Sequence, residues 1–546
     1  MPVFICTGLL VALLVASFSA HADWMNLTGA ETARNIAEIY VLDDHVRVKL
    51  EVYIGDLEKF EELIPDEWFK DSASKRPSLE QRMQTFATER LQFITDEGVT
   101  LPAKLVLAEP RQRVDRQSAY AGMINPLTRR RVQAAPADKR VLYAEIIYPF
   151  DGKPDQLKII PPLDDQDYVT ATIGFVAYHH AVPIIDFRFL GQTATLNLDW
   201  QDPWYTKFDN KNLTRHHKYP LMLFLYVEPR QVRLESLLRA SDIAELTGFK
   251  AEDFQLSAKD KHLLLQQHIK NYYADKDSLQ IDGESFKPDS IRVEFLNVTL
   301  SGLKVIGSST SIDESSLLVG ISQQYLITAL PQRIDSRWPF FNRRINRIPV
   351  VVTDPVGPLK HLIDVDDPEF GWQNYLKKYT EPLIRPVDVN TGWSISIPFV
   401  GDTKIINWMP DEQEALGIIS DVFENVRIAF IERNPARLSH VLGQVTSPNQ
   451  ANSLQKELAK LFSPKVTSGG VSSVQAFEDL KIVNLRELDN PDGFSTTVSG
   501  VAFISAKHWG HIDRRQFQFQ LLLDLIEVNQ QWRLNDITVI DIKKAS

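Results

Sequence analysis

Two stretches of this chain repeat each other at a nearly constant spacing, and this duplication limits the fold more than any other feature of the sequence. His45–Leu50 alternates between apolar and polar residues and leads to Asp56. Gln231–Glu235 does the same and leads to Asp242, 186 residues after Asp56. We interpret the segments as two copies of one unit; the alternative is that strand–helix–strand units simply recur, as they do in any mixed protein.

The two copies continue to match beyond these strands. A stretch with helical apolar spacing follows in each, over Leu79–Phe93 and Ala258–Tyr273. Tyr148 and Tyr325 then stand 177 residues apart, as expected after a small deletion. Short strands with Pro-rich punctuation dominate both copies. We therefore expect two tandem, related β-sandwich-like domains over 23–222 and 223–409, largely antiparallel and each with an inserted helical element.

The C-terminal region, 410–546, has a different pattern. Helical spacing marks Asp411–Arg433, Ala436–Leu442 and Asn449–Leu461. Four strands are predicted to follow, at Val474–Leu488, Ser495–His508, Arg514–Glu527 and Gln531–Ile542, and the third shows a clear period-two alternation over Gln516–Leu521. Three helices before an antiparallel meander resemble the nuclear transport factor two-like (cystatin-like α+β cone) superfamily. That resemblance implies a curved four-stranded sheet, and it leaves function open because the superfamily holds enzymes and non-catalytic modules alike.

The composition excludes several classes of protein. The 546 residues are 44% hydrophobic and 24% charged, which is typical of folded globular proteins. A net charge of -11 argues against a nucleic-acid-coating surface. Residues 1–22 carry no Lys, Arg, Asp or Glu and end in Ala-His-Ala, which predicts a secretory signal peptide. The signal is either cleaved or retained as an anchor, and the protein is expected to be periplasmic or otherwise exported.

The only cysteine, Cys6, lies within the predicted signal. After its removal, disulfides, thiol nucleophiles and zinc–thiolate sites are excluded. No later apolar run is long enough to span a bilayer, so we expect no transmembrane segment after signal removal.

The most unusual local run is His508-Trp509-Gly510-His511, followed by Arg514 and Arg515. Residues three apart on a regular strand face opposite sides, so we expect Gly510 to form a β-bulge that turns both His toward one side. The run then binds an anionic ligand or a metal, or it is an aromatic strand end with a packing role. If the C-terminal domain is an enzyme, His508 would pair with Asp524 or Asp536 as acid and base.

A second cluster lies between the two repeats. Its adjacent His pairs suit copper or zinc only if folding makes at least three ligands converge. Its aromatic and acidic residues suit a sugar platform, or else they fill the seam between the sandwiches. The candidate metal ligands are His179, His180, His216 and His217. The candidate ligand-binding residues are Trp200, Asp202, Trp204 and Tyr205.

The segment Arg111–Arg140 is rich in Arg and poor in apolar periodicity, so it is expected to be a projecting loop that contacts an anionic membrane surface or an acidic partner, or is simply solvated. Four stretches resemble an uncharacterised family of exported bacterial proteins: Ala137–Tyr143, Ile173–His179, Asp199–His217 and His508–His511. That resemblance implies a shared architecture and no activity.

The leading hypothesis is an exported, non-enzymatic binding or assembly protein, with a protein partner or self-association through the C-terminal domain. It needs no cofactor. Metal binding or delivery with copper or zinc, and a small-molecule enzyme in the C-terminal domain, are the alternatives.

Overall fold

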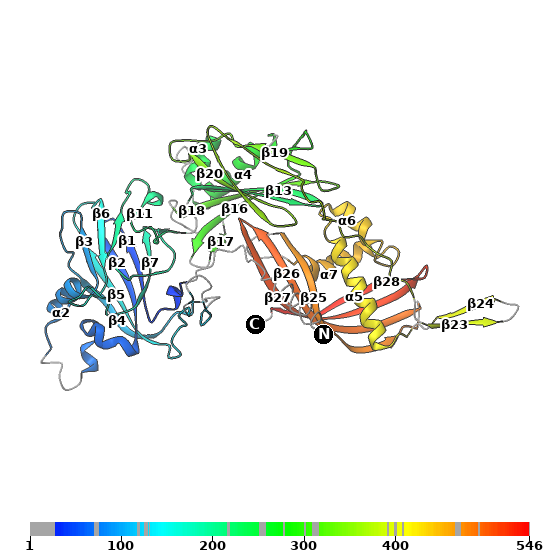
Figure 1. The fold of residues 1–546 in the computed structure, drawn as a ribbon, viewed down its shortest axis with the longest axis horizontal. Helices are drawn as coiled ribbons and strands as arrows, with labels where there is room; N and C mark the ends of the chain where they lie inside the picture. The colour runs from blue at the N-terminus through cyan, green and yellow to red at the C-terminus, as the bar shows by residue number, and fades with distance from the viewer. Residues whose placement is uncertain are drawn as a thin grey trace, which may run out of the picture.

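The chain builds three β-rich parts, visible in Figure 1 as a blue-cyan N-terminal part, a green middle part and an orange-red C-terminal part. The computed structural model describes residues 28–69, 76–116, 121–124, 129, 131–215, 219–250, 258–276, 279–299, 302–307, 316–389, 392–397, 401–406, 409–464, 471–489 and 492–544. The predicted β-rich, α+β, multi-domain class is confirmed at this level. The predicted signal, 1–22, lies outside the described residues.

The N-terminal part packs two sheets against each other. The large sheet has the spatial order β4-β5-β2-β1-β7-β8, with β9 also paired to β7, and the small sheet has the order β11-β10-β6-β3. The large sheet consists of β1 (Asn35–Val41), β2 (His45–Tyr53), β4 (Lys104–Gln112), β5 (Arg140–Pro149), β7 (Ile173–His179), β8 (Val182–Pro183) and β9 (Arg188–Phe189). The small sheet consists of β3 (Gln92–Thr95), β6 (Gln156–Ile160), β10 (Ala194–Asn197) and β11 (Lys207–Phe208).

The middle part has the same two-sheet design. Its large sheet has the order β17-β16-β18-β13-β12-β20-β21 and its small sheet β15-β14-β19-β22. The large sheet consists of β12 (Leu221–Glu228), β13 (Gln231–Arg239), β16 (Ser290–Thr299), β17 (Gly302–Ile306), β18 (Leu317–Leu326), β20 (Arg347–Thr353) and β21 (Pro358–Asp364). The small sheet consists of β14 (Leu279–Ile281), β15 (Glu284–Phe286), β19 (Arg333–Arg337) and β22 (Glu369–Gln373).

The large sheets of the two parts share details of register. Tyr148 stands opposite Val46 in the first, and Tyr325 stands opposite Val232 in the second. Both tyrosines are completely buried, so these residues fill equivalent places in two cores. Each sheet also contains one parallel pair, β1 with β7 and β12 with β20. For those pairs the expectation of antiparallel strands is wrong, because β7 and β20 are reached by long connections.

Helices cover parts of these sheets. The helix expected over Leu79–Phe93 is shorter in the structure. The α-helix α2 (Leu79–Thr85) continues as a π-helical turn that ends at Arg90, and β3 follows. In the middle part, α3 (Ala240–Thr247) and α4 (Ala258–Ala274) follow β13. The remaining short helices are η1 (Ala30–Thr32), η2 (Ile54–Leu63), η3 (Asp66–Trp68) and η6 (Pro203–Tyr205).

The C-terminal part packs three helices on a meander of four long antiparallel strands. The helices are α5 (Glu412–Ala429), α6 (Pro435–Leu442) and α7 (Ala451–Phe462), and the strands are β25 (Val471–Glu487), β26 (Gly493–His508), β27 (His511–Val528) and β28 (Gln531–Lys544). Asp411 and Glu414 close a capping box that fixes the start of α5. A separate hairpin of β23 (Gly392–Ile397) and β24 (Gly401–Ile406) extends away from this part in Figure 1.

Among the described residues, no helix has the length and apolar character needed to cross a membrane.

Candidate binding groove

The aromatic cluster predicted between the repeats lies at the seam between the first two parts. Trp204 is 2% exposed and packs with Val182 of β8 against Phe224 and Tyr226 on the outer face of β12. Trp200 is only partly buried, and its Nε1 donates to the carbonyl of Pro154. Trp204 therefore anchors one domain on the next.

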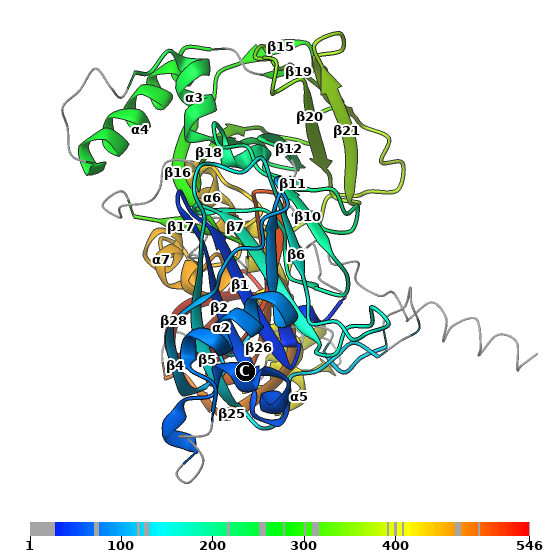
Figure 2. The ribbon, with the colours of Figure 1, turned by 90° about the vertical axis from the view of Figure 1, so that its left-hand side faces the viewer.

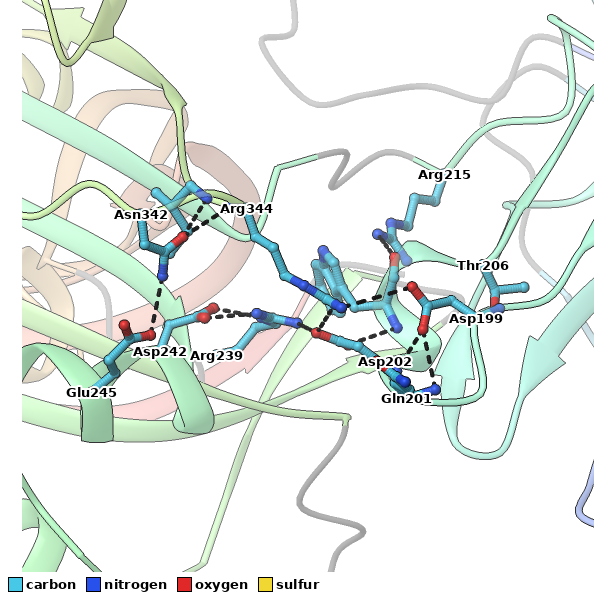
Figure 3. Close-up of polar contacts among 12 residues, drawn as sticks. Asp199, Gln201, Asp202, Thr206, Arg215, Arg239, Asp242, Glu245, Asn342 and Arg344 are labelled. Carbon is cyan, nitrogen blue, oxygen red and sulfur yellow. Dashed lines mark hydrogen bonds and ion pairs between the residues drawn. The ribbon is translucent and has the colours of Figure 1, made fainter.

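Asp202 connects the same seam through charge. Its carboxylate accepts hydrogen bonds from Arg239 at 2.7 Å and from Arg344 at 2.9 Å, as Figure 3 shows. Both guanidinium groups also lie over the ring of Tyr205. Burial lowers the pKa of Arg239, but its bonds to Asp242 and Asp202 outweigh that effect and raise the pKa overall. Two cations and two aromatic rings thus hold the seam together.

The run around Trp509 forms a third junction, between the C-terminal and middle parts. Trp509 is 1% exposed, and its indole lies directly on Gly320 of β18. Its backbone N–H donates to Glu235 at 2.6 Å, and the N–H of Gly510 donates to the Tyr226 hydroxyl at 3.0 Å. The tip of the β26–β27 hairpin is therefore inserted into the outer face of the middle sheet, where the red and orange strands reach the green part in Figure 1.

Ion pairs surround this tip. Arg233 pairs with Glu235 at 2.9 Å and donates to the carbonyl of Lys507, and Lys507 pairs with Glu228 at 3.2 Å. Burial by itself would raise the pKa of Glu228, but Lys507 and Arg233 hold it at about 2. Burial raises the pKa of Glu235, against the opposing effect of Arg233.

The bulge expected at Gly510 is wrong. Trp509 and Gly510 both have positive φ, of 45° and 77°, and form the two-residue turn between β26 and β27. His508 and His511 are the backbone pair that closes this turn, and no extra residue interrupts the register on either side of it.

His508 cannot act with Asp524 as an acid–base pair. Asp524 stands opposite Ser495, which lies 13 residues before His508 on β26, or about 43 Å at ~3.3 Å per residue. Asp536 stands opposite Asp524 on β28 and is equally remote. On β27, shortly after the turn, Arg514 is exposed and Arg515 is half-buried.

The interior between the helices and the meander is filled with aromatic rings. Phe423 on α5 packs with Phe462, Phe477 and Phe519, and Trp532 is 2% exposed beside Phe494. The described residues leave a pocket of about 220 Å3 near Trp532, which the segment 384–387 borders.

The predicted histidine cluster is described only in part. His179 is completely buried, with Nδ1 at 2.7 Å from the Thr206 hydroxyl, and its ring stacks on His180 and meets Trp200 edge-on. Burial, with a smaller effect of His180, lowers the pKa of His179 to about 4. His216 and His217 lie outside the described residues. In the described part of the chain, no group of three His, Cys, Asp or Glu side chains is arranged to hold a metal ion.

Several basic residues of the Arg111–Arg140 segment bind within the chain. Arg116 pairs with Glu51 and Glu38, and Arg113 donates to the carbonyl of Ala33. The Arg111 guanidinium lies over the Tyr143 ring. Contact of this segment with a membrane or an acidic partner stays a prediction.

A groove that the sequence did not suggest opens in the middle part. It has a volume of about 820 Å3 and lies over the small sheet, beside the edge strand β21. β19 and β22 alternate, so that Ile334, Phe370 and Trp372 enter the core and the residues between them face outward. The outward set is Arg333, Asp335, Arg337, Glu369, Gly371 and Gln373.

Gly371 shapes the groove. A Cβ at this position would lie 2.1 Å from the carbonyl oxygen of Ile334, so a larger residue would force the backbone to shift. Without a side chain at its centre, β22 presents bare backbone to the groove. Leu359 and His361 of β21 border the opposite side, and Tyr375 at one end is 79% exposed.

The groove carries charges of both signs. Arg333 pairs with Asp335 at 2.7 Å, and this hydrogen bond raises the pKa of Arg333. Arg337 adds a positive charge, His361 adds an imidazole ring, and Glu369 adds a carboxylate. Such a surface provides polar contacts and an aromatic side chain without selecting one sign of charge.

Sequence reasoning missed these residues because it searched for clustered His and Trp. The available signal was the alternation Arg333-Ile334-Asp335-Ser336-Arg337, which predicts a strand with a charged outer face. That pattern is common to solvated strands and does not reveal a groove.

No protein-family model matches the chain, and the search of curated proteins found no match.

Proposed function

We propose that this is an exported, non-enzymatic binding or assembly protein whose partner occupies the groove over β19 and β22. The observation that carries the proposal is the opening of about 820 Å3 between the small sheet and β21, bordered by exposed Tyr375 and by charges of both signs. Its volume lies within the range of ligand-binding clefts, and its position along β22 and β21 favours an extended ligand.

The seam residues support this assignment by their location. Trp204 and Trp509 are almost fully buried between parts of the chain, and Asp202 is engaged by two arginines. A ligand could reach Trp204 or Trp509 only by separating the domains. We assign these residues to domain assembly.

We also propose that 23–222 and 223–409 are two copies of one domain and that 410–546 is a cone-like module related to the nuclear transport factor two-like superfamily. The shared strand order and the equivalent places of Tyr148 and Tyr325 support the first proposal. Helices packed on a four-stranded meander support the second. The predicted signal, 1–22, supports export to the periplasm.

Photo-crosslinking in the producing cell tests the function. A photoreactive phenylalanine replaces Tyr375 in one variant and Tyr168, which is 68% exposed on the N-terminal part, in a matched control. We expect a discrete adduct from position 375 alone. Equal labelling from both positions, or no adduct from 375, contradicts a binding role for the groove.

A further inference from the structure

The edge of β22 is one place where the two sandwiches differ. In the small sheet of the N-terminal part, β10 has β6 on one side and β11 on the other. In the middle part, β22 holds the place of β10 and pairs with β19, and among the described residues no strand pairs with its other edge. Figure 2 shows β11 beside β10.

The register makes the comparison specific. Leu196 on β10 stands opposite Leu157 on β6, and Trp372 on β22 stands opposite Ile334 on β19. Leu196 and Trp372 are both buried. Thr195 and Asn197 on β10 therefore correspond to Gly371 and Gln373 on β22.

Backbone hydrogen bonds show which groups of β22 face outward. The N–H of Asn374 donates to the carbonyl of Gln332 at 2.9 Å, so the Asn374–Gln332 pair is bonded toward β19. Because bonded and non-bonded pairs alternate in an antiparallel ladder, Trp372 is also bonded inward. The N–H and C=O groups of Gly371 and Gln373 therefore point to the open edge.

β11 uses the corresponding groups of β10. The N–H of Asp209 donates to the carbonyl of Thr195 at 2.9 Å, and Lys207 stands opposite Asn197. Phe208, opposite Leu196, is 6% exposed and turns into the core. The N-terminal part thus shows what fits such an edge: a short extended segment with one large apolar side chain facing inward.

We propose that β22 binds an extended segment of a separate partner polypeptide as an added antiparallel strand, which deepens the proposed binding function and rests on it. Backbone groups of the segment pair with Gly371 and Gln373. A large apolar side chain opposite Trp372 packs toward Leu359 and His361, as Phe208 packs in the N-terminal part. Because the groove has charges of both signs, backbone pairing supplies the affinity and added salt changes it little.

The probe is a synthetic peptide copying residues 205–211, which contain β11. Fluorescence anisotropy with the full chain measures binding, and hydrogen exchange of 369–373 locates it. N-methylation of the peptide at Asp209 removes an edge-facing donor, and we expect a loss of about tenfold in affinity. N-methylation at Phe208, whose N–H faces away from the edge, is the matched control and leaves affinity within about twofold.

Variants of the full chain provide an independent test of strand addition. Gln373→Pro removes an outward N–H without touching the bonds to β19, whereas Gln373→Ala keeps it. We expect only the Pro variant to lose binding, with unchanged far-ultraviolet circular dichroism. Equal effects of both N-methyl peptides, or no protection of 369–373 at millimolar peptide, overturn the proposal.

Two other results would refute this proposal and leave the binding role of the groove intact. A crosslinked adduct at Tyr375 without peptide protection of 369–373 leaves the binding role intact and refutes strand addition. A concentration-dependent dimer that Gln373→Pro dissolves identifies the occupant as a second copy of the chain, which refutes a separate partner.

Discussion

Replacing Trp509 by Ala should release the C-terminal part from the middle part without unfolding either. The indole is 1% exposed and rests on Gly320. A buried Trp removes roughly 150–250 Å2 from water, worth about 4–6 kcal/mol at ~25 cal/mol per Å2. Measured truncations of buried Trp cost about 3–5 kcal/mol. We therefore expect the docking equilibrium to weaken about a thousandfold, because 1.4 kcal/mol is about a factor of ten.

Scanning calorimetry and hydrogen exchange measure this effect. In Trp509→Ala, the C-terminal part should melt in a separate transition, and the amides of residues 509 and 510, which donate to Glu235 and Tyr226, should lose protection. Trp68→Ala is the control, because Trp68 is 41% exposed and far from the junction in the sequence. If Trp509→Ala resembles Trp68→Ala in both measurements, the hairpin tip does not hold the domains together and the reasoning is wrong.

Three further predictions concern stability. The pKa of His179 is about 4 when folded and ~6.5 when unfolded, so the unfolded state binds more protons between these values. The contribution of His179 to the free energy of unfolding should be fully present above pH 6.5 and should fall toward pH 4 by at most about 3 kcal/mol. Urea titrations at several pH values should show a weaker dependence of this free energy on pH in His179→Phe. Asp202→Asn weakens two ion pairs at the seam and should cost about 1–3 kcal/mol in urea unfolding; a change below ~0.5 kcal/mol would mean that the seam is held by packing alone. Gly371→Ala forces a Cβ to within 2.1 Å of the Ile334 carbonyl oxygen and should lower the melting temperature by several degrees, whereas Gly191→Ala, with open space around it, should be neutral.

Local patterns predicted much of the secondary structure. The helix expected from Asp411 begins at Glu412, with Asp411 as its cap, and the strand expected to end at His508 does so. Equivalent positions for Tyr148 and Tyr325 were also visible in the spacing. These features depend on residues close together in the sequence or on the constant spacing of matching segments, which the sequence displays directly.

The remaining features depend on contacts between distant segments. Trp509 and Gly510 suit a turn as well as a bulge, and only the pairing of β26 with β27 decides between them. The burial of Trp204 depends on the face of β12 that it meets. The groove arises because a strand beside β22 is missing from the described sheet, and no residue type marks a missing neighbour.

The junction at Trp509 also bears on how the chain matures. Its backbone bond to Glu235 spans 274 residues, and its donor lies close to the C-terminus. Synthesis proceeds from the N-terminus, so Glu235 and its sheet face emerge long before the hairpin that covers them. The middle domain must pass through an interval in which a charged, aromatic face is open to water and to proteases. We expect interruption of the chain before β26 to leave that face open permanently, so that truncated products are degraded although two domains are complete.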